Sequence, residues 1–106
     1  MRINFNHLDD VAMCPKFFEE VREAFWNVAQ PDDLQIITPF LEACTETGRL
    51  HHKACGDIAV ILRRLVSKFP THEAHEDYVK MAAFRICDGL EKAAALEEDF
   101  KMEGTI

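Results

Sequence analysis

The chain has 106 residues, of which 12 are Lys or Arg and 19 are Asp or Glu, so its formal net charge is −7. This length is typical of one domain, and we expect residues 1–106 to form a single helical domain. A charge of −7 repels phosphate backbones and anionic membrane surfaces, which disfavours direct binding to nucleic acid or to a membrane. With 48% hydrophobic residues but only four Gly and four Pro, the chain should fold around a core.

The first ten residues, MRINFNHLDD, lack the basic region and the apolar stretch of a secretory signal. No run approaches the 18 apolar residues of a membrane span. The four cysteines contain no CxxC pair, and they are Cys14, Cys44, Cys55 and Cys87. This usage is typical of free thiols in a reducing compartment, so we expect a cytoplasmic protein.

The first half of the chain predicts two helices. Apolar residues recur every three or four positions over residues 14–29, and Pro15 suits a first helical turn. A second helix follows Pro31 and runs to Gly48, a typical C-terminal cap. Because Pro39 lies inside this pattern, the second helix is either kinked there or begins at Thr38 as its cap.

The second half predicts two more helices, over residues 49–69 and from residue 71 or 72 to about Met102. The fourth is apolar over much of its circumference, and Gly89 in its middle indicates the close approach of another helix. The one candidate strand is RINFN near the start, residues 2–6. We therefore predict an all-α protein, a compact bundle of about four helices with a long C-terminal helix.

Residues 36–66, IITPFLEACTETGRLHHKACGDIAVILRRLV, resemble a single HEAT-type hairpin. The resemblance lies in a proline followed by Phe40 and Leu41 in the first helix, a short turn, and a second helix with Ala54 and Ile58. The arginine usual early in the second helix of such repeats is replaced by a histidine. The resemblance implies packing of α-hairpins and a scaffold that binds proteins through helix faces.

The segment GRLHHKACGD contains the best candidate metal ligands, His51, His52 and Cys55. On a helix Cys55 lies three or four residues from each histidine, so one face could present a thiolate and an imidazole. Zinc needs four ligands, and His72 and His75 would lie about 25 Å away at the far end of an antiparallel helix pair. Cys55 also continues an apolar stripe, so burial in the core is the favoured interpretation, and we expect no cofactor.

Motifs for common catalytic sites are missing from the sequence. There is no GxSxG, no GxxxxGK[ST] and no GxGxxG, and Ser67 is the only serine. The segment THEAHED lacks the glutamate that zinc proteases place between two histidines four residues apart. We therefore do not expect an enzyme.

Charge patterning indicates a partner protein instead. Arg63, Arg64 and Lys68 form a small basic patch, whereas much of the remaining surface is acidic. We predict a small non-enzymatic protein-binding factor, of inhibitor, immunity or adaptor type, that occludes a basic partner surface. The predicted contact residues are Trp26, Glu97, Glu98, Asp99 and Phe100, with Trp26 or Phe100 as an exposed apolar anchor, although the pattern fits Trp26 equally well in the core. The alternatives are a metal-binding or redox bundle that uses the His and Cys residues, and a homo-oligomer formed through the fourth helix.

Overall fold

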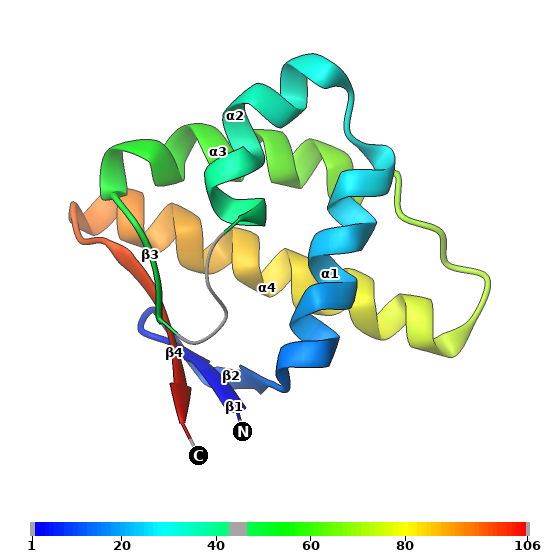
Figure 1. The fold of residues 1–106 in the computed structure, drawn as a ribbon, viewed down its shortest axis with the longest axis horizontal. Coiled ribbons are helices and arrows are strands. Elements are labelled where there is room, and N and C mark those ends of the chain that lie inside the picture. The colour runs from blue at the N-terminus through cyan, green and yellow to red at the C-terminus, as the bar shows by residue number, and fades with distance from the viewer. Residues whose placement is uncertain (1, 43–46, 106) are drawn as a thin grey trace.

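The computed structural model describes residues 2–42 and 47–105, and these form four helices and one four-stranded antiparallel sheet (Figure 1). In chain order the elements are β1 (Arg2–Phe5), β2 (Leu8–Met13), α1 (Pro15–Val28), α2 (Pro31–Leu41), β3 (Thr47–Leu50), α3 (His52–Val66), α4 (Ala74–Leu96) and β4 (Phe100–Thr105). The prediction of an all-α bundle is therefore wrong, and the protein is an α+β domain.

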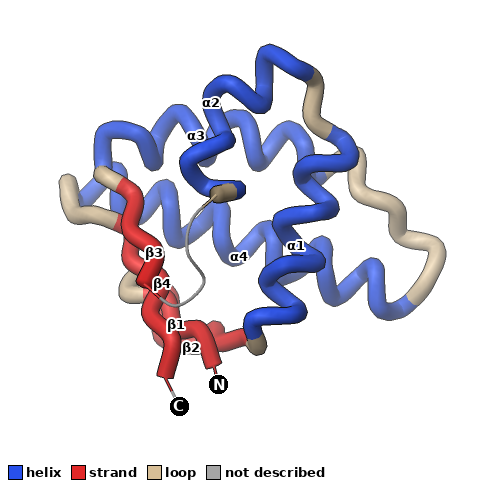
Figure 2. Tube along the Cα trace, in the orientation of Figure 1, coloured by secondary structure: helices blue, strands red, loops and turns tan. Residues whose placement is uncertain are grey.

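The sheet joins the two ends of the chain. Its strand order is β2-β1-β4-β3, and β1 pairs with β4 so that Ile3 lies opposite Gly104. Figure 2 shows the four strands gathered on one side of the domain, while α3 and α4 run side by side beyond them. This arrangement depends on pairing between segments about a hundred residues apart in the sequence. Such pairing cannot be predicted from the local periodicity of apolar residues.

The second and third predicted helices form α2 and α3 but are shorter than predicted, because strand β3 lies between them. The second predicted helix stops at Leu41, and Gly48 lies in β3 instead of capping a helix. The HEAT-type hairpin is therefore wrong, because a strand lies between α2 and α3 where a short turn was predicted. The first predicted helix, by contrast, is confirmed as α1, and the candidate strand RINFN is confirmed as β1.

The end of the fourth predicted helix is also a strand. Helix α4 ends at Leu96, where Glu97 caps it in the left-handed conformation with φ of 56°. In β4, Phe100 and Met102 are buried while Lys101 and Glu103 are exposed, which is the alternation of a strand with one face on the core. The chain therefore reverses direction after α4, which places β4 between β1 and β3.

The core links this sheet to α4 and α1. Phe100 stacks on Phe5 with ring centroids 5.7 Å apart, and Phe5 meets Phe18 of α1 edge to face at the same distance. A Cβ atom on Gly89 would lie 2.8 Å from the Phe100 ring and 3.0 Å from Leu8 Cγ. Gly89 thus does mark a close approach, but to the strands and not to another helix as predicted.

The helices within residues 2–42 and 47–105 include none that is long and apolar enough to cross a bilayer.

Candidate functional site

Helix α1 has one face buried in the core and an opposite face that is exposed and charged. Phe18, Val21 and Phe25 point into the core and are fully buried, as their helical spacing predicts. Trp26 lies on the outer side and is 57% exposed, so it belongs to the surface and not to the core. Glu23 and Glu19 are exposed about one and two turns before it, respectively.

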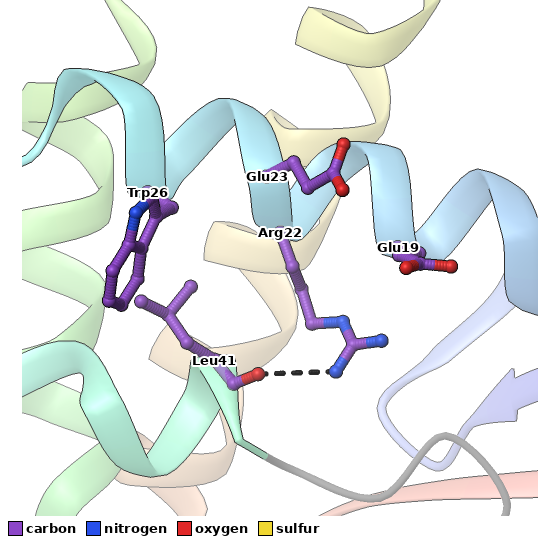
Figure 3. Close-up of a pocket in the computed structure, with 5 residues that line it drawn as sticks. All are labelled: Glu19, Arg22, Glu23, Trp26 and Leu41. Carbon is purple, nitrogen blue, oxygen red and sulfur yellow. Dashed lines mark hydrogen bonds between the residues drawn. The ribbon is translucent and has the colours of Figure 1, made fainter.

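The exposed indole borders a hollow of about 230 Å³ between α1 and the end of α2, lined by Glu19, Arg22, Glu23, Trp26 and Leu41. Figure 3 shows the indole beside the Leu41 side chain, with Arg22 extending toward the Leu41 carbonyl. Arg22 Nη1 donates to that oxygen over 3.1 Å, and its guanidinium lies 4.9 Å from the centre of the Phe18 ring. The arginine is thus held by the chain itself.

A second hollow, of about 240 Å³, lies on the other side of α1, toward the start of α4. Glu23 lines both hollows, and Glu20 lines the second. Glu20 Oε2 is 2.7 Å from Nε2 of His75 on α4. We use the name α1 acidic face for Glu19, Glu20, Glu23 and Trp26.

The predicted acidic turn at Glu97, Glu98 and Asp99 is used in part by the fold. The Asp99 carboxylate accepts hydrogen bonds from Arg49 Nε at 2.6 Å and from the backbone N–H of His52 at 3.2 Å. The hydrogen bond from Arg49 lowers the pKa of Asp99. This carboxylate therefore ties the start of α3 to the end of α4 and is not free to meet a partner.

Of the other predicted contact residues, one is buried and two are exposed. Phe100 is fully buried, so its prediction as an exposed anchor is wrong. Glu97 and Glu98 are exposed, but they lie at the opposite end of α4 from His75, which contacts α1. The separation along the helix is about 33 Å, from 1.5 Å rise per residue. The contact between α1 and α4 at His75 is therefore far from the acidic turn, so we treat Trp26 and the turn as two separate candidate surfaces.

The candidate metal ligands have structural roles. The His51 Nδ1 atom accepts from the backbone N–H of Lys53 at 3.2 Å as the N-cap of α3, and its ring lies 4.3 Å from that of His52. Cys55 is fully buried, as favoured from the sequence, its thiol faces the Leu50 carbonyl oxygen at 3.8 Å, and burial raises its pKa. Within the described residues, no three His, Cys, Asp or Glu side chains could hold a metal ion together.

The two arginines of the predicted basic patch, Arg63 and Arg64, are paired within the chain. Arg63 makes two hydrogen bonds of 2.7 Å to Glu91 and also pairs with Asp88, while Arg64 pairs with Asp33. The hydrogen bonds from Arg63 lower the pKa of Glu91. These two arginines therefore connect α3 to α4 and to α2 within the chain.

The remaining cysteines do not cluster. Cys14 is the exposed N-cap of α1, where its sulfur accepts from the backbone N–H of Phe17 at 3.4 Å, and Cys87 is buried in the core. Cys44 also lies on an apolar stripe of the sequence and is predicted to be a core residue, but its position is outside the described residues.

Sequence reasoning missed Glu19, Glu20 and Glu23 as site residues, because adjacent carboxylates are typical of a solvated helix face. The signal that could have found them is their spacing from Trp26, since Glu19, Glu23 and Trp26 fall on successive turns of one outward stripe. The chain was compared with protein-family models, with curated proteins and with solved structures, and none of the three comparisons finds a match.

Proposed function

We propose that this protein binds another protein by docking the α1 acidic face on a basic partner surface, as an inhibitor, immunity-type or adaptor factor. The observation that carries the proposal is the exposure of Trp26 beside two carboxylates, Glu19 and Glu23. Within the described residues, neither carboxylate forms an ion pair. Both charges are therefore available to a cation from outside.

The chemistry of these side chains suits a basic partner. A tryptophan is a frequent hot spot in protein interfaces, and its ring face attracts the cationic groups of Lys and Arg. The two carboxylates that precede it on α1, within a chain whose net charge is −7, add long-range steering. Covering a functional basic surface is enough for inhibition, so the proposed action is occlusion without catalysis. We place it in the cytoplasm, where the described cysteines would stay free thiols.

Two charge-matched double variants test where the partner binds. Glu19→Lys with Glu23→Lys reverses charge on the α1 acidic face, and Glu97→Lys with Glu98→Lys makes the same change in net charge at the far end of α4. We expect the first variant to lose the partner that wild-type protein captures from its own cells, and the second to retain it, as measured by quantitative mass spectrometry of captured complexes. Equal loss in both variants would mean that only overall charge matters and would contradict the proposal.

Self-association through the outer face of α4 is a second proposal, supported by a separate observation. Tyr78 and Met81 are 65% and 64% exposed, and Phe84 continues their stripe at a spacing of three. Asp77 precedes the stripe, and Arg85, which pairs with Asp10 and Asp88 within the chain, follows it. In an antiparallel pair of copies centred on Met81, the exposed apolar stripes would cover each other, and the level of Asp77 in one copy would match that of Arg85 in the other.

Sedimentation equilibrium tests the self-association. We expect a dimer at high protein concentration that Met81→Glu abolishes, because the substitution would bury a charge at the centre of the pair. Val60→Glu is the matched control, since Val60 is exposed on α3 and lies outside the stripe. A monomer at all concentrations, or equal dissociation by both variants, would contradict the proposal.

A further inference from the structure

The hollow between α1 and the start of α4 differs in kind from the one beside Trp26. Its floor is apolar, formed by Ala24 of α1, Phe69 and Pro70 after α3, and Val79 of α4. Phe69 is held in place by an edge-to-face contact with Phe25, with centroids 4.9 Å apart. The volume of about 240 Å³ suits one large side chain.

The rim of this hollow is acidic. Glu20, Glu23 and Glu76 line it, together with Asn27 and His75. Glu76 accepts backbone N–H bonds from the two residues before α4, at 2.9 and 3.1 Å, so the start of the helix fixes its orientation. Glu20 pairs with His75, whereas neither Glu23 nor Glu76 forms an ion pair within the described residues. Three carboxylates against one imidazole make the mouth of the hollow negative at neutral pH.

We propose that this hollow, here called the α1–α4 socket, binds an arginine side chain presented by the partner. The inference rests on the proposed function, because a basic partner surface would supply the arginine. The alkyl part of an arginine would cover the apolar floor while the guanidinium meets the acidic rim. Purely apolar side chains would strip water from the rim carboxylates without compensating them, and anions would be repelled.

Arginine fits the rim better than lysine does. Its planar guanidinium offers several N–H donors in a fixed plane, and therefore bridges two carboxylates at once. Glu20 and Glu23 are three residues apart on α1, which places them as neighbours on one helix face. Because Glu23 borders both hollows, the socket and the Trp26 hollow meet at this carboxylate.

Titration with Nα-acetyl-arginine amide, followed by ¹H–¹⁵N correlation NMR at low salt, tests the socket without any knowledge of the partner. The matched control ligand is Nα-acetyl-citrulline amide, which has nearly the same shape and no charge. We expect saturable shifts in the backbone signals of Ala24, Asn27 and Val79 with the arginine ligand, and at least tenfold weaker binding of the citrulline ligand, because charged hydrogen bonds are lost.

Glu23→Gln is expected to weaken the arginine ligand about tenfold, while Glu97→Gln, which removes the same charge far from the socket, leaves it unchanged. Equal binding of the arginine and citrulline ligands, or shifts confined to other parts of the domain, would overturn the inference. The outcome is separable from that of the proposed function. If the α1 double variant lost the captured partner and the arginine ligand did not bind, the docking face would be supported and the socket would be wrong.

Discussion

Replacing Phe100 with alanine is expected to lower the free energy of unfolding by about 3–5 kcal/mol, the usual cost of emptying a large aromatic site in a core. Phe100 is fully buried, stacks on Phe5, and would lie within 2.8 Å of a Cβ atom on Gly89. It therefore joins β4, β1 and α4 at one point, and the space it leaves cannot be filled by a simple shift of one element. Urea denaturation of the purified protein measures the change.

Phe84→Ala is the matched control for this prediction. The substitution removes the same ring, but from a position that is 39% exposed on the outer face of α4. We therefore expect the free energy of unfolding to fall by no more than about 1 kcal/mol. The comparison also tests the fold. A continuous fourth helix to Met102, as the sequence pattern predicts, gives no reason for a large difference between the two positions, and equal losses would contradict the buried strand β4.

Replacing Trp26 with alanine is expected to weaken partner binding at least thirtyfold, or about 2 kcal/mol, as for a central interface hot spot. The free energy of unfolding should change little, because the indole is 57% exposed and contributes little to the core. Isothermal titration calorimetry with the captured partner, once purified, measures the affinity, and urea denaturation measures the stability.

Leu96→Ala provides the control for Trp26→Ala. Leu96 is also a large exposed apolar residue, but it lies at the last turn of α4, next to the acidic turn. We expect it to leave the affinity unchanged. If Leu96→Ala weakened binding and Trp26→Ala did not, the partner would contact the acidic turn, and the proposed docking on the α1 acidic face would be wrong.

The helices of this protein were largely predictable, because each buries one stripe that repeats along its own sequence. Helix α1 is an example, since the spacing of Phe18, Val21 and Phe25 is sufficient to identify it. Strand β4 was not predictable in this way. Phe100 follows Leu96 by four residues and so continues a helical register, and the break at Glu97 requires a left-handed residue without the usual glycine signal.

Strand β3 carries even less local information. It has four residues, among them Gly48, and its identity comes from pairing with β4, in which Leu50 lies opposite Phe100. Short strands of this kind are stable because a neighbour supplies hydrogen bonds and a buried face, and the neighbour here lies fifty residues away. The preference for an all-α fold followed from counting local periods alone.

The candidate site was only partly predictable for the same reason. Exposure of Trp26 depends on which side of α1 meets the core, and the sequence left its position open between core and surface. The acidic turn was identified by composition, but Asp99 is tied to Arg49, a contact between residues fifty positions apart. Charge counts identify acidic segments, whereas the tertiary fold decides which carboxylates remain free.

Site-specific photo-cross-linking tests the central claim most directly. A benzophenone amino acid would replace Trp26 in one variant and Leu96 in another, and both would be irradiated in the protein's own cells. We expect a single cross-linked protein from position 26, attached within a surface rich in Lys and Arg, and none of that product from position 96. Cross-linking from position 96 alone, or attachment at position 26 to a surface without basic residues, would contradict it.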